Sequence, residues 1–458
     1  MSLLPNLLAS RRGRLTAFFF LYVAEGIPLG FTATAIVTQM RRAGIGPDQI
    51  GAFIAVLYLP WGWKWAIGPV VDLVYSDRLG RRRLWIAAAQ FFMILSLLSI
   101  MRVQIDPEHL RLFFIAAICL NIFSATQDVA IDALACGTLR KEERGLANGL
   151  MFAGSYLGIM AGGAGILFLN DFLDDYFQNS FRLSFLFVIG AILSILLLVT
   201  LPLRETRQKE PTPRQGPVWL ALLRELLHYL RSALRAFFGS RSAVAAMILS
   251  LLPIGSYSLS LVLQANLAVE IGMKDKEIAL LGVITGLLSA GCCVLGGILS
   301  DRFGRRRMLA LYILAMAIPP TILAYSMQAH YWILPIDPTD ANHRVASAAL
   351  VRTFWLVSMI YATFAGFAYG TRHAIFMDVC DPKVAATQFT AYMALLNVGI
   401  SYSAFWQGHA IDKLGYPTTL DLDVMVGFLC LAVLPFVKPR PSAELPEDDV
   451  GGEDINVA

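Results

Sequence analysis

The chain has 458 residues, of which 57% are hydrophobic and only 15% are charged, and its formal net charge is +4. Soluble globular domains average about 45–50% apolar and about 25% charged residues, so this composition excludes an ordinary soluble protein. The apolar residues fall in long blocks and the basic residues gather at their flanks. The small positive charge therefore does not indicate a nucleic-acid partner.

About twelve apolar stretches follow one another along the chain, each near the roughly 20 residues that cross a bilayer as a helix. Inside lipid every backbone N–H and C=O group must be bonded within the protein, so these stretches predict helices. The sequence therefore predicts an all-α membrane protein surrounded by the lipid bilayer. The expected spans are 15–38, 49–71, 84–103, 112–135, 146–169, 183–203, 242–267, 277–300, 308–326, 347–377, 388–410 and 420–437.

Three arginines, Arg11, Arg12 and Arg14, precede the first span, as at the start of a signal peptide. The block that follows is too long for a signal peptide and lacks a small-residue cleavage site, so we expect a retained helix. Lys and Arg in the loops set the orientation. Placing the N-terminus in the cytoplasm puts most of the 37 Lys and Arg residues on the cytoplasmic side. We therefore expect both termini in the cytoplasm.

Two nearly identical segments, DRLGRRR at 77–83 and DRFGRRR at 301–307, follow the second and the eighth expected spans. A repeat at equivalent places predicts two six-helix halves, as in major facilitator transporters. In each segment a glycine turn can hold an Asp and several Arg against neighbouring helix ends, through bonds that break when the halves rock. The alternative is that these arginines only set the topology. The expected gating residues are Asp77, Arg78, Gly80, Arg81, Asp301, Arg302, Gly304 and Arg305.

The repeat divides the chain into four expected parts. Residues 1–203 form the N-terminal six-helix bundle and residues 242–437 form the C-terminal one. Residues 204–241 connect them, and their apolar residues at helical spacing with interleaved arginines predict an amphipathic helix on the inner membrane face. Residues 438–458 are Pro-rich and acidic, which predicts a disordered, solvated tail in the cytoplasm.

Ionisable residues inside the expected spans are the first candidates for function, because a charge in lipid is costly without a partner. Glu25 lies in the first span, Lys64 in the second and Arg372 in the tenth. Asp128 and Asp132 lie four residues apart, on one side of the fourth span. At 1.5 Å per residue, Asp128 and Lys64 lie roughly 24 and 22 Å from the outer ends of their helices. A Lys64–Asp128 pair is therefore expected.

Each of these residues has competing interpretations. Two close carboxylates favour proton uptake by one of them near neutral pH, so Asp128, Asp132 and Glu25 are candidates for proton coupling. The pair of Lys64 with Asp128 could instead be a buried ion pair that only fixes the packing. Glu25 either faces a cavity or pairs across helices. Arg372 could clamp a carboxylate or phosphate with its planar fork, or extend to the cytoplasmic surface.

Motifs for other chemistry are missing from the sequence. The six cysteines form no pair in an outer loop, so we expect neither a disulfide framework nor a metal site. The chain has no P-loop, so we expect no nucleotide cofactor. It also has no HExxH or GxSxG motif in a helix, so we do not expect an enzyme.

Five short motifs resemble those of AmpG-type permeases, the peptide–acetyl-coenzyme A transporter branch of the major facilitator superfamily. The most distinctive, A-T-Q-D-x-A-x-D-A, is present in full in the fourth span. Glu25 departs from the family, which has small or polar residues there. The five matching segments are Gly26–Pro28, Leu59–Asp72, Gly80–Trp85, Ala125–Ala133 and Ala386–Gln388.

The resemblance implies a proton-driven importer in the cytoplasmic (inner) membrane that works by alternating access, as a monomer and without a cofactor. The family's substrates are cell-wall muropeptides (anhydro-muramyl peptides), acetyl-coenzyme A and, in close relatives, siderophores. The A-T-Q at the start of the eleventh span favours muropeptides. In this fold helices 1, 4, 7 and 10 line the path, so Glu25, Gln127 and Arg372 are candidates for contact with the small-molecule substrate. Lys64, in the second span, is a further candidate because it is expected beside Asp128. Importers of siderophores or other small peptide-like solutes, and pigment-handling or assembly factors of the same fold, are the alternatives.

Overall fold

The computed structural model describes residues 6–73, 80–103, 109–139, 144–174, 176–177, 180–205, 217–260, 262–337, 344–380 and 385–438. Helices follow one another throughout these segments. The helices before the connecting segment are α1 Arg11–Gly30, α2 Val37–Arg42, α3 Pro47–Gly62, α4 Lys64–Leu73, α5 Arg83–Arg102, α6 Leu110–Thr138, α7 Arg144–Met160, α8 Ile166–Asp174 and α9 Ser180–Ile195. The later helices are α10 Val218–Phe238, α11 Arg241–Leu251, α12 Val262–Glu270, α13 Asp275–Phe303, α14 Arg305–Ala329, α15 Ala348–Val379, α16 Ala385–Leu414 and α17 Tyr416–Val433.

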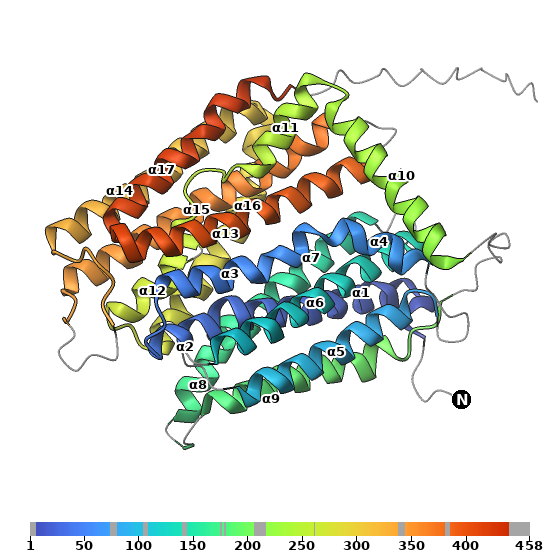
Figure 1. Cartoon of the computed structure of the whole chain (residues 1–458), viewed down its shortest axis with the longest axis horizontal. Coiled ribbons are helices and arrows are strands. Elements are labelled where there is room, and N and C mark those ends of the chain that lie inside the picture. The colour runs from blue at the N-terminus through green and yellow to red at the C-terminus, as the bar shows by residue number, and fades with distance from the viewer. Residues whose placement is uncertain are drawn as a thin grey trace, which may run out of the picture.

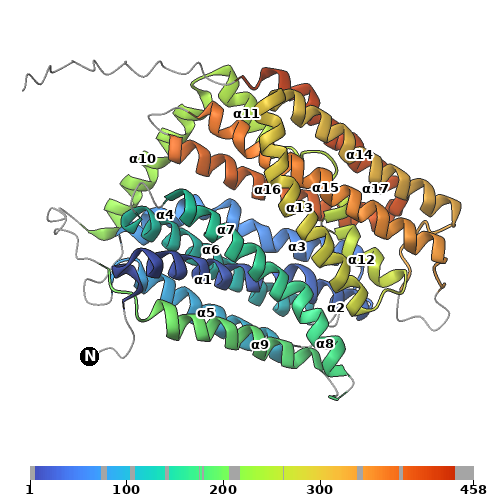
Figure 2. The ribbon, with the colours of Figure 1, turned by 180° about the vertical axis from the view of Figure 1, so that it is seen from behind.

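We refer to α1–α9 as the first half and to α11–α17 as the second half. In Figure 1, α1, α5, α6 and α9 lie below, α11, α14, α15 and α17 lie above, and α3 and α16 lie side by side where the two groups meet. Figure 2 shows the same arrangement from behind. We name the two ends of the molecule after their helices: α1 begins at the α10 end, on the right of Figure 1, and α2 ends at the α12 end.

The all-helical membrane architecture expected from the sequence is confirmed. Within the described residues, nine helices are long and apolar enough to cross a membrane. The other three expected spans correspond to α3 with α4, α11 with α12, and α16.

Two spans that the sequence predicted as continuous are broken in the structure. The second is interrupted at Trp63, between α3 and α4, three residues after Pro60. The seventh is interrupted between Leu251 and Val262. This interruption contains Pro253 and also Gly255, whose φ of +69° suits glycine. Proline removes a helical N–H donor, and irregular backbone at membrane depth persists only where the protein satisfies its polar groups.

Glycines bring α1 and α7 into close backbone contact in the first half. A Cβ atom added at Gly26 would lie 2.2 Å from the carbonyl oxygen of Ser155, so no side chain fits there. Gly158 and Gly162 present the same kind of surface from the α7 side. Small residues that let backbones approach are a usual device of membrane helix pairs. This contact explains the glycine of the Gly26–Pro28 motif.

Helices α3 and α16 join the two halves. An added Cβ at Gly51 would lie 2.8 Å from the Cα atom of Gly408, so these helices touch through glycine near the α12 end. Ser401 of α16 donates a hydrogen bond to the carbonyl oxygen of Ala55, at 2.7 Å. The halves are therefore in direct contact on this side of the molecule.

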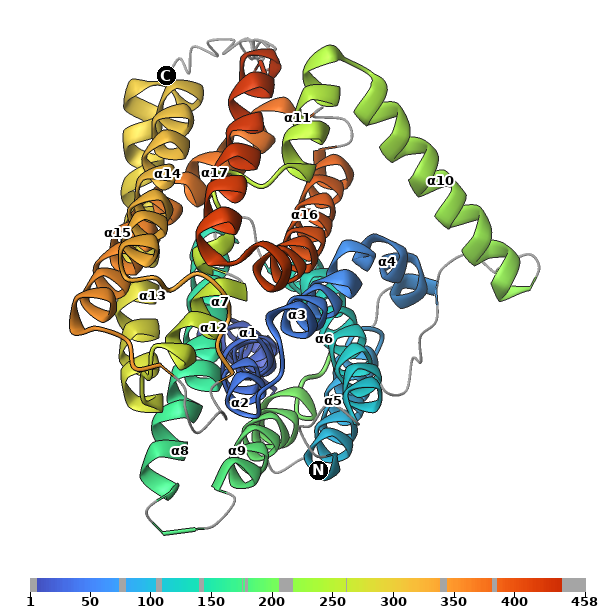
Figure 3. The same cartoon turned by 60° about the vertical axis from the view of Figure 1, so that its left-hand side comes forward.

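Helix α10 occupies the stretch predicted to be amphipathic. Figure 3 shows it running along the outside of the molecule from near α4 to α11, and it contacts α4 of the first half and α11 and α16 of the second. Trp219, Leu223, Leu227 and Leu234 are exposed along it. Its contact with the membrane face remains a prediction. The predicted tail beyond residue 438 lies outside the described residues.

Candidate functional site

Lys64 and Asp128 form the expected pair in the first half. The Nζ atom of Lys64 lies 3.0 Å from Oδ2 of Asp128. Lys64 is the first residue of α4, directly after the break at Trp63, so the break determines where its side chain begins. Asp128 is buried in α6, with 6% of its side chain exposed. The structure thus brings two of the predicted residues into contact.

Asp132 lies one turn further along α6, and its partner comes from α1. The hydroxyl of Tyr22 donates a hydrogen bond to Oδ1 of Asp132, at 2.6 Å. Asp132 is exposed although Asp128 is buried. Of the two carboxylates on this side of α6, one is therefore paired inside the protein and the other can reach solvent.

Glu25 lies on the same side of α1 as Tyr22, three residues on, and is 8% exposed. It is within electrostatic range of Lys64, Asp128 and Asp132. Its Oε2 atom has no hydrogen-bond partner among the described residues. Three carboxylates therefore surround one ammonium group, which is an arrangement that leaves negative charge to be balanced by a proton or another cation.

Gln127 precedes Asp128 in α6 and is fully buried. Its Nε2 atom approaches the carbonyl oxygen of Leu21 in α1 at 3.5 Å. Its Oε1 atom has no partner in the described part of the chain. This position ties α6 to α1 beside the carboxylates, so substrate contact by Gln127 stays a prediction.

Arg372 is the corresponding charged residue in the second half. It is 5% exposed, so it does not extend to the surface. Its Nη1 atom donates a hydrogen bond to the Tyr257 hydroxyl at 2.8 Å, and its guanidinium carbon lies 5.6 Å from the centre of the Tyr369 ring. Its Nε atom has no partner among the residues described. The Nε–H group is therefore a buried donor without a partner in the described conformation.

Tyr369 lies near both Lys64 and Arg372. Its hydroxyl is within electrostatic range of Arg372 in the second half and of Lys64 in the first. Tyr369 is 44% exposed, and Tyr58 of α3 is within the same range of it. Two cations and two phenols from opposite halves therefore approach a common region between the halves.

The α12 end is held closed by ion pairs between the halves. Arg41 in α2 bonds to Glu270, the last residue of α12, and both side chains are buried. The hydroxyl of Tyr416 also donates to Glu270. Next to them, Arg42 lies 2.5 Å from Asp275 at the start of α13. Separating a buried ion pair leaves each charge inside the protein without its partner, which is energetically costly. These pairs therefore stabilise the closed state of the α12 end, which can open only when they separate.

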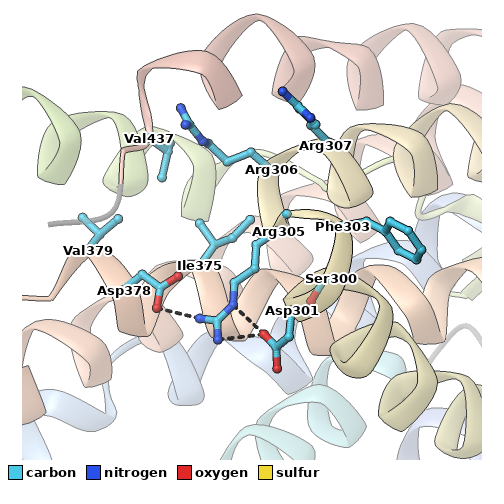
Figure 4. Close-up of a pocket in the computed structure, with 11 residues that line it drawn as sticks. Ser300, Asp301, Phe303, Arg305, Arg306, Arg307, Ile375, Asp378, Val379 and Val437 are labelled. Carbon is cyan, nitrogen blue, oxygen red and sulfur yellow. Dashed lines mark hydrogen bonds and ion pairs between the residues drawn. The ribbon is translucent and has the colours of Figure 1, made fainter. Parts of the chain in front are cut away.

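The gating motif of the second half lies at the opposite, α10 end. Arg305 bonds to Asp301 at 2.9 Å and to Asp378 at 2.6 Å, so it joins the start of α14 to the end of α15 (Figure 4). Gly304 has φ +94°, which explains the glycine of the motif. Arg302 is exposed and lies over the Phe303 ring.

The first-half motif is described only in part, since Asp77 and Arg78 lie outside the described residues. Gly80 has φ +92°, matching Gly304. The backbone N–H groups of Arg82 and Arg83 both donate to Oε1 of Glu205, and Arg81 is half-buried. Glu205 therefore holds the backbone of this motif, whereas Asp378 in the other half bonds the side chain of Arg305.

Comparison with known proteins decides the family. The model of the Major Facilitator Superfamily matches residues 15–257 and 245–453, which is nearly the whole chain. The chain belongs to the Major Facilitator Superfamily. The crystal structure of a D-xylose–proton symporter has a TM-score of 0.66 at 14% identity and covers 93% of this chain and 98% of its own. A POT family transporter in complex with 5-aminolevulinic acid gives a TM-score of 0.66 at 11% identity, covering 92% and 95%.

Curated relatives within this superfamily carry the AmpG name. The anhydromuropeptide permease of Escherichia coli K12 is 26% identical over 403 residues, covering 86% of this chain and 74% of the relative. A transporter named AmpG 4 of Rickettsia conorii is 22% identical over 436 residues, covering 93% and 97%. The resemblance drawn from the motifs is therefore confirmed. As a facilitator-superfamily protein with permeases as relatives, the protein is a multi-pass membrane transporter and not an enzyme.

Four residues that form central contacts in the structure were not predicted from the sequence: Tyr22, Arg41, Glu270 and Asp423. Arg41 and Glu270 lie at span ends, where charge is ordinary. Asp423 lies four residues into the expected twelfth span and is fully buried. Its position inside an apolar stretch was the available signal. Tyr22 gave no signal, because a tyrosine in a span is most often a packing residue.

Proposed function

We propose that this protein is a proton-coupled secondary transporter that imports cell-wall muropeptides across the cytoplasmic membrane. The substrate class rests on the relative named anhydromuropeptide permease. The observation that carries proton coupling is the group of three carboxylates, Glu25, Asp128 and Asp132, around the single ammonium of Lys64. An inward proton gradient can drive transport only if such a site binds protons differently in the two conformations.

We propose that residues 1–203 and 242–437 are the two rocking bundles of a monomer, with both termini in the cytoplasm of a cell whose inner membrane holds the protein. In this orientation the α12 end faces outwards. The Arg41–Glu270 pair then closes the outer side, and the exposed Asp132 is reached from the cytoplasm. The described conformation therefore corresponds to the inward-facing state of an alternating-access cycle.

The proton step follows from the Lys64–Asp128 contact. In the outward-facing state a proton from the external solution binds a carboxylate oxygen of Asp128 and neutralises it. The ammonium of Lys64 then loses its partner and becomes free to bind an anionic group of the substrate. After the halves rock, the proton leaves Asp128 for the cytoplasm and the 3.0 Å contact between Lys64 and Asp128 forms again. The substrate then loses its contact with Lys64 and is released. The carboxylates of Glu25 and Asp132 can also bind this proton during its transfer.

The chemistry of the site suits a muropeptide. Such a molecule carries peptide carboxylates and sugar rings. The ammonium group of Lys64 and the guanidinium group of Arg372 can bind carboxylates from opposite halves. The exposed ring of Tyr369, between them, offers a face for a sugar. An apolar pigment would leave these charges without partners, which disfavours a pigment-handling role.

The test is uptake of radiolabelled anhydro-muramyl tripeptide into proteoliposomes, with and without an inward proton gradient. Wild type is compared with Asp128→Asn, and Asp412→Asn, an exposed carboxylate at the end of α16, is the matched control. Gradient-dependent uptake that Asp128→Asn loses and Asp412→Asn keeps supports the proposal. Failure of well-folded wild type to take up the tripeptide overturns the substrate, and uptake of a ferric siderophore instead would assign the protein to the siderophore importers.

A further inference from the structure

The break in the seventh span is clamped from one side by α17. Between α11 and α12 the backbone is irregular, and its polar groups need partners within the protein. The thiol of Cys430 donates to the carbonyl oxygen of Pro253, at 3.0 Å. An added Cβ at Gly427 would lie 2.4 Å from the carbonyl carbon of Gly255, so only glycine allows this approach.

Asp423 completes this face, because 423, 427 and 430 are spaced four and three residues apart along α17. One carboxylate oxygen of Asp423, Oδ2, accepts a hydrogen bond from the backbone N–H of Ser258, at 2.9 Å, and another from the hydroxyl of Ser256. The other oxygen accepts from Nε2 of Gln407, at 2.7 Å. None of the ion pairs found in the described segments includes Asp423, which is fully buried. Its contacts therefore go to hydroxyl and amide donors.

Tyr257 lies between the two serines that Asp423 bonds. Its hydroxyl accepts the hydrogen bond from Nη1 of Arg372. Tyr361 of α15 adds a further restraint, since its hydroxyl donates to the carbonyl oxygen of Ser256 at 2.6 Å. The backbone on both sides of Tyr257 is thus fixed, and through Tyr257 so is the guanidinium group of Arg372.

We propose that Asp423 is a positioning residue for substrate binding: by holding Ser256 and Ser258, it places Tyr257 so that the guanidinium group of Arg372 is kept in the geometry that binds an anionic group of the substrate. This inference rests on the proposed function of Arg372. An arginine side chain loses considerable rotamer freedom on binding. A group that is already held in the binding geometry avoids much of this cost, so the effect falls on substrate affinity.

The test is Asp423→Asn, with Asp421→Asn as the matched control because Asp421 lies two residues away on the same helix and is exposed. In proteoliposome uptake we expect the KM for anhydro-muramyl tripeptide to rise about tenfold in Asp423→Asn, while the maximal rate stays within about twofold. The control keeps both values. A fall in maximal rate with unchanged KM overturns the proposal.

A double-mutant cycle tests the route through Tyr257. Tyr257→Phe removes the hydroxyl that holds Arg372, so adding Asp423→Asn to it should raise KM no further. Fold-changes that multiply in the double variant overturn the proposal. If Asp423→Asn does not fold, Ser256→Ala can be used instead, because it removes one of the same contacts. We expect it to raise KM as well, but by a smaller factor.

A transport-independent measurement separates this inference from the proposed function. In Tyr257→Cys protein, Asp423→Asn should increase the rate of maleimide labelling of the new thiol severalfold, while Asp421→Asn leaves it unchanged. This result can be obtained whatever the transported solute is. Equal labelling rates in all three backgrounds overturn the clamp, whereas lack of tripeptide uptake by wild type overturns the substrate assignment only.

Discussion

The first half and the second half of the molecule contain very different groups of polar side chains. In the first half, three carboxylates gather around Lys64, and one of them, Asp132, is exposed. In the second half, Arg372 is surrounded by tyrosine, and the nearby Asp423 is enclosed by serine and glutamine donors. A site with excess carboxylates can exchange protons, whereas a site of fixed neutral donors around an arginine can recognise an anion. The difference suggests that proton coupling belongs to the first half, whereas recognition of the anionic substrate is shared by Lys64 in the first half and Arg372 in the second.

Asp128→Asn should have the largest effect and is the strongest test of this division. The amide keeps the shape but cannot exchange a proton, so gradient-driven accumulation should fall by at least about 100-fold. Exchange of labelled for unlabelled substrate without a gradient should persist, because it requires no net proton movement. Loss of both activities together would mean that Asp128 is needed for substrate binding as well as for proton coupling.

Glu270→Gln tests the contact that joins the halves at the α12 end. Removing one charge from a buried pair costs about 3–5 kcal/mol, so the closed state of this end should become less populated. A cysteine introduced as Ala268→Cys should then react with an external maleimide more than tenfold faster. Glu277→Gln, an exposed carboxylate nearby, is the control, and identical labelling rates in the two variants would exclude the pair as an outer gate.

Arg372→Lys probes recognition in the second half. Lysine keeps the charge but loses the planar fork and the hydrogen bond to Tyr257, so KM should rise about tenfold, equivalent to ~1.4 kcal/mol. The dependence of uptake on the proton gradient should not change. Arg352→Lys, an exposed arginine on the same helix, should behave as wild type. A variant with normal KM and altered proton dependence would reverse the roles assigned to the two halves.

Tyr22→Phe should have the smallest effect. It removes the 2.6 Å hydrogen bond to Asp132 but leaves the Lys64–Asp128 pair intact. A single hydrogen bond to a charged group contributes about 1.5–3 kcal/mol, and solvent can replace part of it at an exposed carboxylate, so the rate should fall by about threefold or less. Uptake under a fixed gradient measures this. A loss as large as that of Asp128→Asn would make Asp132 the principal proton carrier.

Much of the first-half site could be predicted from the sequence. The four-residue spacing of Asp128 and Asp132 and the matching depths of Lys64 and Asp128 follow from helix geometry, and the Lys64–Asp128 contact is found. The two motif glycines also follow, because a tight turn with positive φ favours glycine. The break after Gly62 was not predicted, since Pro60 within an apolar run is compatible with either a kinked or an interrupted helix.

The apolar spans, the repeated D-R-x-G-R-R motif and the ionisable residues within the spans could all be found in the sequence alone, because hydropathy and helical spacing are local properties. The tertiary structure alone decided the partners: Tyr22 for Asp132, Glu270 for Arg41, and Ser256 with Ser258 for Asp423. These pairs join residues more than a hundred positions apart. Such contacts depend on how helices pack against one another, which no local pattern of residues specifies.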